Sequence, residues 1–279
     1  MSDAAVPPAR RSVALTVGLA LAGIHVAAAL LTLVWTPYDP ASMAGGRLEA
    51  PSWAHSAGTD RLGRDFFTQI MIGSRIALQV GAGAVAIGAL IGVTLGVLAA
   101  FATRLLDDAL AATLDILIAF PILLLAMLVV AASESASLGT AILALGIAMS
   151  SIVARLTRIL AKRVLAQDYI VASRTSGTSW PGVVARHVLP NIWPTLAVNL
   201  ALQFGLAIIA EASLSYLGLG APPPNASWGR LLQEAQGTVY TAPIGAIAPG
   251  IALVTLVIGV NLVADGLRDV GDPTRRGRR

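Results

Sequence analysis

Long uncharged, apolar stretches alternate with short polar ones along this chain, and the apolar stretches have the length of a bilayer crossing. The first spans residues 12–35 without a single charge. At 1.5 Å per residue a helix of that length measures about 36 Å, enough to cross a hydrocarbon core of about 30 Å. The same criterion predicts six membrane-spanning helices, at residues 12–35, 76–101, 109–132, 138–154, 195–218 and 244–264.

The connecting segments complete the predicted organisation. Residues 1–11 form an N-terminal tail, and residues 36–75 form a long loop in which we expect a short helix. Residues 155–194 and 219–243 join the fourth, fifth and sixth helices, and residues 265–279 form a C-terminal tail. None of these segments is large enough for a domain of its own. We therefore predict one all-α integral membrane domain.

Composition supports this class and narrows the function. The chain is 56% hydrophobic and only 12% charged, whereas a soluble chain carries about 25% charged residues. It has no cysteine, which excludes disulfides and thiolate metal sites. Its net charge is +4, but the basic residues only separate apolar runs and no aromatic residues are interleaved with them. We expect no nucleic-acid partner.

Arginine and lysine predict the orientation, because cytoplasmic loops keep the excess of positive charge. With the N-terminus inside, fourteen basic residues fall in inner segments and five in outer ones. Both termini and residues 155–194 are therefore predicted to face the cytoplasm. The five outer basic residues are Arg47, Arg61, Arg64, Arg75 and Arg230.

The second predicted helix has a small residue at every fourth position. These residues are Ala84, Gly88, Gly92, Gly96 and Ala100. Such spacing produces a smooth strip on one helix face, along which another backbone can approach closely in the membrane. We interpret the strip as a packing surface whose partner lies in this chain or in another subunit.

Residue sets for catalysis are missing from the sequence. There is no G-x-S-x-G, H-E-x-x-H or C-x-x-C motif. In the predicted topology His25 lies within a membrane span, His55 lies outside the cell membrane and His187 lies on the cytoplasmic side. We expect packed or interfacial histidines and no metal site. A P-loop needs Gly-Lys-Ser/Thr, which the only lysine, Lys162, does not provide. The chain cannot hydrolyse ATP by that route, and we predict no catalytic or cofactor site.

Two carboxylates, Asp115 and Glu211, lie within predicted spans. Intramembrane acids often serve transport, but interfacial placement explains Asp115 and helix packing explains Glu211 equally well. A self-sufficient secondary transporter could use both as ion relays, although the sequence shows no inverted repeat or paired broken helices. An intramembrane enzyme is a further alternative, for which no nucleophile or metal set is in register.

The most polar part of the inner segment 155–194 is DYIVASRTSGTSWPGVVARHVLPN, residues 168–191. Residues 167–176 contain no helix breaker, and Gly177 readily takes the left-handed conformation that closes a helix. Ser179 or Thr178 can cap a second helix with Pro181 in its first turn, and Pro190 is expected to end it. The result is a helical corner at the membrane surface, suited to enter a groove on another protein.

Just before this stretch, Arg155, Arg158 and Lys162 are three and four residues apart. They share one face if the fourth helix continues into the cytoplasm. We interpret them as a basic collar that faces lipid phosphates.

Several phrases resemble one known family. Ala172-Ser173, Gly177 and Leu189-Pro190 match the glycine-bearing cytoplasmic loop of bacterial ABC importer permeases. The family is that of the dipeptide, oligopeptide and nickel permeases. The other matching phrases are Gly58-Thr-Asp-Arg-Leu-Gly-Arg-Asp65, Ser213-Leu-Ser-Tyr-Leu-Gly-Leu-Gly220, Ser227-Trp-Gly229, and Asn261 through Asp265-Gly-Leu-Arg-Asp269 to Asp272-Pro273. The phrase at residues 58–65 is similar to that of the second, C-type, permease of the pair.

The resemblance implies a heteromeric importer in the bacterial inner membrane that moves peptides or a related small solute inward. Residues 76–264 would form its permease core. The implied partners are a homologous second permease, two ATPase subunits that bind ATP and Mg²⁺, and an external or lipid-anchored substrate-binding protein. This chain itself would bind no cofactor.

The resemblance also assigns residues to roles. A coupling helix would dock on the ATPase, and its residues would be Tyr169, Ile170, Ala172, Ser173, Arg174, Thr175, Ser176, Gly177 and Thr178. The translocation path or external gate would include Glu211, Tyr216, Trp228 and Asn261. Two positions depart from the family pattern, with Val171 in place of a glutamate and His187 in place of an isoleucine. Without that glutamate, Arg174 becomes the expected polar contact with the ATPase.

Overall fold

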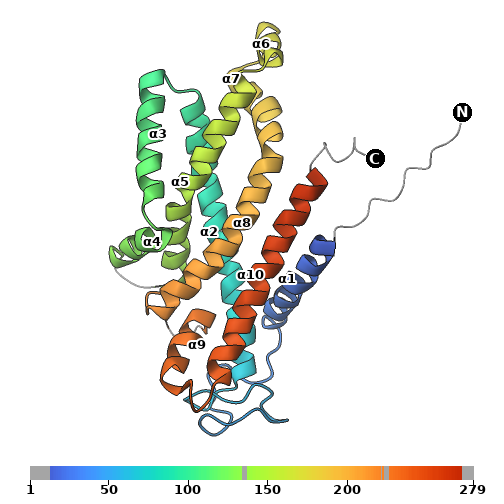
Figure 1. Ribbon diagram of the computed structural model, residues 1–279, viewed down its shortest axis with the longest axis vertical. Coiled ribbons are helices and arrows are strands. Elements are labelled where there is room, and N and C mark those ends of the chain that lie inside the picture. The colour runs from blue at the N-terminus through green and yellow to red at the C-terminus, as the bar shows by residue number, and fades with distance from the viewer. Residues whose placement is uncertain (1–12, 134–136, 221, 223–225, 272–279) are drawn as a thin grey trace, which may run out of the picture.

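The computed structural model describes residues 13–133, 137–220, 222 and 226–271, and helices dominate this part of the chain (Figure 1). The only extended pairing among these residues is an isolated bridge between Thr59 and Asp65. The helices are α1 (Val13–Leu31), α2 (Phe66–Ala100), α3 (Arg104–Ala119), α4 (Ile122–Ala131), α5 (Leu138–Leu165), α6 (Asp168–Thr175), α7 (Trp180–Val183), α8 (Leu189–Tyr216), α9 (Trp228–Ala235) and α10 (Ile244–Gly271), with a π-helical turn η1 (Val184–Val188) and a 3-10 turn η2 (Gln236–Thr238).

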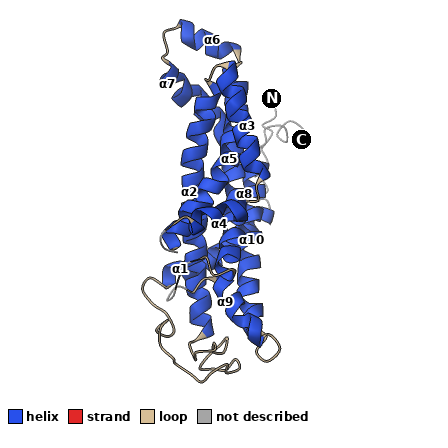
Figure 2. Ribbon diagram, turned by 90° about the vertical axis from the view of Figure 1, so that its left-hand side faces the viewer, coloured by secondary structure: helices blue, strands red, loops and turns tan. Residues whose placement is uncertain are grey.

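The long helices lie side by side in an elongated bundle (Figure 1 and Figure 2). Helix α2 packs mainly on α5, and α1 packs on α10 and α2. Helices α6 and α7 lie at one end of the bundle, and α9 with the loop of residues 36–65 lies at the other. Five helical segments of the described chain are long and apolar enough to cross a membrane, or six if the bent pair α3 and α4 forms one span. The all-α membrane fold is thereby confirmed.

Helix α2 begins at Phe66 rather than at residue 76. Asp65 is its N-cap, and its Oδ2 atom accepts hydrogen bonds from the backbone N–H and the hydroxyl of Thr68, both at 2.8 Å. The predicted loop of residues 36–75 is therefore shorter. The short helix expected within it is the first part of α2, and Arg75 lies inside that helix.

The prediction of one continuous helix at residues 109–132 is wrong. Helices α3 and α4 meet at an angle of 91° around Phe120 and Pro121. Phe120 has an extended backbone with ψ 133°, as expected for a residue before proline, and Pro121 lacks the N–H that would continue the helix.

Helix α5 continues to Leu165, beyond the predicted span that ends at residue 154, so Arg155, Arg158 and Lys162 lie on one continuous helix. The prediction that Pro190 ends a helix is wrong. Residues 180–216 run on through α7, η1 and α8. The π-helical turn widens the helix just before Pro190, which relieves the clash that proline makes in a regular α-helix. The side-chain amide of Asn191 donates to the carbonyl oxygen of His187 at 2.6 Å.

The strip of small residues on α2 packs against α5 of the same chain, as one of the two interpretations predicts. A Cβ atom on Gly92 would lie 2.7 Å from the carbonyl oxygen of Ser150, and one on Gly96 would lie 2.5 Å from that of Ala154. Such distances leave no room for a side chain, so the two backbones are in direct contact.

We expect Gly96→Val to destabilise the bundle, because its side chain would force α2 and α5 apart. Overpacking of this kind costs about 1–3 kcal/mol. The measurement is the melting temperature of the purified protein in detergent. Gly23→Val in α1 is the matched control, since a Cβ at Gly23 meets nothing within 4 Å. Equal melting temperatures for the two variants would contradict the packing role of the strip.

Candidate functional site

The corner between α6 and α7 has the backbone that its sequence predicts. Gly177 has a φ of +86°, in the left-handed region. Just after it, the N–H of Thr178 donates to the carbonyl oxygen of Ser173 at 3.1 Å. Ser179 then caps α7, with its hydroxyl accepting from the N–H of Gly182 and Pro181 in the first turn. A helix, a glycine corner and a second helix follow one another.

The inner face of α6 is fixed to the bundle. Ile170 is buried in a cluster with residues of α5, α7, η1 and α8. The hydroxyl of Ser173 lies 3.0 Å from the hydroxyl of Thr178 and 3.0 Å from Nε2 of His187. The ring of Tyr169 lies 5.9 Å from that of His187. The histidine that replaces the family's isoleucine therefore clamps α6 onto the turn η1.

Arg174 has its partners within the corner itself. Its Nη1 atom donates to the carbonyl oxygen of Thr178, and its guanidinium lies over the ring of Trp180 at 4.3 Å. Trp180 in turn packs edge-on against Phe101 at the end of α2, with ring centroids 5.2 Å apart. Arg174 thus braces the corner, while its expected contact with an ATPase stays a prediction.

The outward face of α6 carries mostly small side chains, with the exposed carboxylate of Asp168 at the start of the helix. It exposes Val171, Ala172, Thr175 and Ser176, and the Val171 side chain is 63% exposed. The hydroxyls of Thr175 and Ser176 donate to the carbonyl oxygen of Ala172 at 2.9 and 3.0 Å. Because these two hydroxyl protons are already donated within the helix, this face presents its shape to a partner more than it presents hydrogen-bond donors.

The three basic residues of α5 have acidic partners on α3, which the interpretation of a basic collar toward lipid phosphates does not include. Arg158 and Lys162 both bind Asp107 of α3, with Arg158 Nε 2.5 Å from Oδ1. Arg155 lies 3.3 Å from Asp115, which is partly exposed. Pairing lowers the energy of charges near lipid, and α3 supplies the acids. The ion pairs hold α3 against the part of α5 that leads to α6.

At the opposite end, Glu211 joins α8 to α9. Its buried carboxylate accepts hydrogen bonds from the hydroxyl of Ser215 at 2.6 Å and from that of Ser227. Ser227 is also the N-cap of α9. Gly229 lies against the backbone of Ala212, too close for any side chain. The phrase Ser-Trp-Gly therefore seats α9 directly on α8.

Trp228 anchors α9 on the bundle. It is buried, and its indole N–H donates to the carbonyl oxygen of Ile70 at 3.0 Å. The ring of His25 packs edge-on against it, 5.3 Å between centroids. His25 also lies 3.3 Å from the hydroxyl of Ser74 and 2.9 Å from that of Thr255. As expected, His25 is a packed histidine, here joining α1 to α2 and α10.

The four predicted path residues do not form one cluster. Glu211 and Trp228 are near each other through Ser227, whereas Tyr216 is exposed at the end of α8. Asn261 on α10 faces Gly205, further along α8. Within the described part of the chain, no group of three or more His, Cys, Asp or Glu residues is placed so that it could hold a metal ion.

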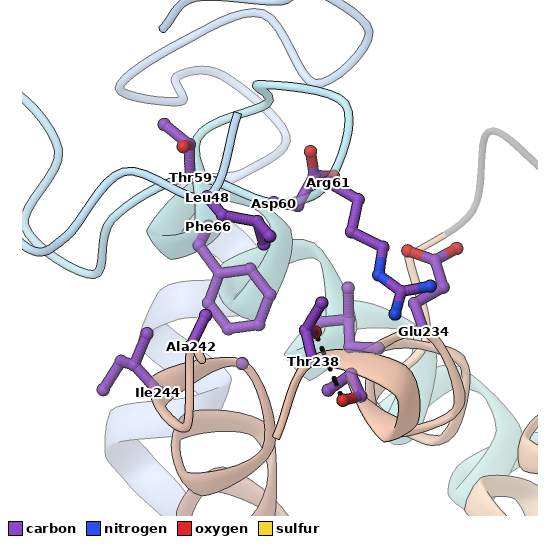
Figure 3. A pocket seen from close by; sticks show the side chains of 12 residues that line it. Leu48, Thr59, Asp60, Arg61, Phe66, Glu234, Thr238, Ala242 and Ile244 are labelled. Atoms are coloured by element: carbon purple, nitrogen blue, oxygen red, sulfur yellow. Dashed lines mark hydrogen bonds between the residues drawn. The ribbon is translucent and has the colours of Figure 1, made fainter. Parts of the chain in front are cut away.

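The phrase at residues 58–65 forms a hydrogen-bonded turn that contacts α9, a role that was not predicted from the sequence. Asp60 accepts from the N–H groups of Leu62 and Arg64, and Arg64 Nε lies 2.6 Å from its carboxylate. Arg64 also reaches Glu234 of α9 at 3.5 Å. Figure 3 shows the small pocket that remains between this turn, α9 and the start of α10. The signal was present in the sequence as an acid and an arginine four residues apart, Asp60 and Arg64, in a stretch that also holds Gly58 and Gly63. Both glycines have a positive φ in the structure.

These features define a multi-pass membrane subunit with a braced helical corner at one end and a hydrogen-bonded loop at the other. Residues 92–277 match the family described as the inner membrane component of binding-protein-dependent transport systems, and the chain belongs to that family. It is therefore a permease subunit of a bacterial ABC transporter, located in the inner membrane and working with other subunits.

Individual relatives cover most of the chain. It is 38% identical to a dipeptide transport system permease protein of Alkalihalophilus pseudofirmus, over 81% of this chain and 74% of that protein. It is 39% identical to a putative peptide transport system permease protein of Brucella suis, over 92% of this chain and 86% of that protein. It is also 39% identical to a glutathione transport system permease protein of Pectobacterium atrosepticum, over 90% of this chain and 85% of that protein.

Glu211→Gln should leave transport nearly unchanged, because an amide oxygen still accepts from Ser215. Glu211→Leu should destabilise the protein by about 1–3 kcal/mol, since buried hydroxyls lose their acceptor. Uptake by cells and the melting temperature of the purified protein check the two variants. A well-folded Glu211→Gln protein without uptake would instead indicate an ionisable relay.

Proposed function

We propose that this chain is the second of two homologous permeases in an importer driven by ATP, and that it carries short peptides into the cytoplasm. Two separate ATPase subunits hold ATP and Mg²⁺, and an external binding protein delivers the solute. This chain contributes no nucleotide site, since its only lysine is not in a Gly-Lys-Ser/Thr sequence. Its task is to convert movement of the ATPases into rearrangement of the bundle.

The observation that carries the proposal is the construction of α6. Its inner face is fastened by Ile170, Ser173 and Arg174, so the helix cannot shift without moving its surroundings. Its outward face carries mostly small side chains, as a helix that enters a groove requires. A push on α6 therefore reaches α5, α7 and α8 directly.

The substrate class rests on the relatives. Their names refer to dipeptides, peptides and glutathione, which is itself a tripeptide. Small solutes with amide groups and free charged ends are common to all three. We assign the same class to this chain.

The test is uptake of radiolabelled glycyl-leucine and glutathione by cells that lack their own importers for these peptides and express the complete transporter. Uptake should require every subunit and intact ATPases. Uptake by this permease alone, driven by an ion gradient, would refute the proposal and favour a secondary transporter.

Gly177→Val should uncouple the transporter. A side chain in the left-handed conformation costs about 1–2 kcal/mol, so the corner should lose its orientation and peptide uptake should fall by about tenfold. Gly177→Asn is the matched control, since asparagine tolerates this conformation better. Membrane insertion should be normal in both. Full uptake with Gly177→Val would contradict a coupling role for this corner.

A further inference from the structure

The indole of Trp53 is completely exposed in the loop of residues 36–65. Its relative exposure is 107%, which exceeds that of every other large hydrophobic residue described. A tryptophan in water leaves the largest apolar side chain unburied, and contact with a partner would recover that area. The exposed indole therefore indicates a contact surface for a partner molecule.

The backbone that carries Trp53 is held in a hydrogen-bonded turn. The N–H of Ser52 donates to the carbonyl oxygen of His55 at 2.8 Å, and the N–H of His55 donates to the hydroxyl of Ser52 at 3.1 Å. The hydroxyl of Tyr38 donates to the carbonyl oxygen of Ala54 at 2.6 Å. Both neighbours of the indole are thus fixed, and the side chain is presented from an ordered tip.

The tip is fastened to the bundle through His55. Its Nδ1 atom lies 2.9 Å from Oδ1 of Asp65, and both side chains are buried. The ring of Tyr38 packs on that of His55, with centroids 4.8 Å apart. The other oxygen of Asp65 caps α2 through Thr68. A short series of contacts therefore leads from Trp53 to the first turn of α2.

We infer that Trp53 is an anchor for the external binding protein, an inference that rests on the proposed function. Tryptophan is enriched among the few residues that carry most binding energy at interfaces. An anchor on an ordered loop also loses little conformational freedom on binding. The partner surface should offer an apolar pocket with an acceptor for the indole N–H.

The surroundings of Trp53 favour a protein partner in water over lipid. Six charged residues lie between residues 45 and 65, which places this loop outside the hydrocarbon core. The loop lies at the end of the bundle opposite α6, beside α9 (Figure 1 and Figure 2). A family whose transport depends on a binding protein requires a docking surface at its outer end.

The first test measures ATP hydrolysis by the complete transporter in nanodiscs against the concentration of the purified binding protein. Trp53→Ala should raise the half-maximal concentration at least about tenfold and leave the maximal rate unchanged. Tyr240→Ala is the matched control, because Tyr240 is 99% exposed but lies outside this loop. An unchanged half-maximal concentration for Trp53→Ala, or an equal shift in both variants, would overturn the inference.

The second test identifies the occupant. Because the chain has no cysteine, Ala54→Cys introduces its only thiol, next to Trp53, for a photoactivated crosslinker. Illumination should join this position to the binding protein. Attachment to lipid or to the second permease would refute the assignment. If the binding protein does not change the rate of ATP hydrolysis but position 54 still crosslinks to it, the importer proposal is refuted and the assignment of Trp53 as an anchor is kept.

Discussion

Close backbone contact between α2 and α5 is the constraint on which the rest of the structure depends. Lipid gives helices no hydrophobic reason to associate, so the pair relies on the van der Waals contact that Gly92 and Gly96 allow. Helix α5 leads to the corner at α6, and α2 begins at the Asp65 cap that ends the loop of residues 36–65. Both ends with a proposed partner are therefore mounted on the same closely packed pair.

Buried polar contacts then fix the remaining helices to that pair or to one another. His25 joins α1 to α2 and α10, Asp107 joins α3 to α5, and Glu211 joins α8 to α9. Polar groups are costly in a membrane unless they find partners, so each contact allows few alternative arrangements. Small residues set the distance between helices, and these polar groups set their register.

The predictable part of this protein is local in sequence. Hydropathy predicts the helices, small residues at every fourth position predict the packing strip, and Gly177 with Pro181 predicts the corner. The break at Pro121 was missed because flanking apolar residues kept that stretch long enough for one span. The pairing of Asp107 with Arg158 joins residues 51 positions apart, and no spacing rule reaches that far. Trp53 was missed because exposure depends on the folded loop.

The two ends of the bundle use different chemistry, and the difference fits their tasks. The outward face of α6 has Val171 where the family pattern has an acid, and its hydroxyls are bonded to its own backbone. The proposed docking there would depend mainly on fit, because most exposed side chains of this face are small and uncharged. The opposite end of the bundle instead exposes the large indole of Trp53 on a fixed tip, which would give the proposed anchor its binding energy at a single point. Of the proposed partners, a binding protein that arrives with solute and leaves again would suit a contact at a single point, whereas an ATPase that stays attached would suit a close fit.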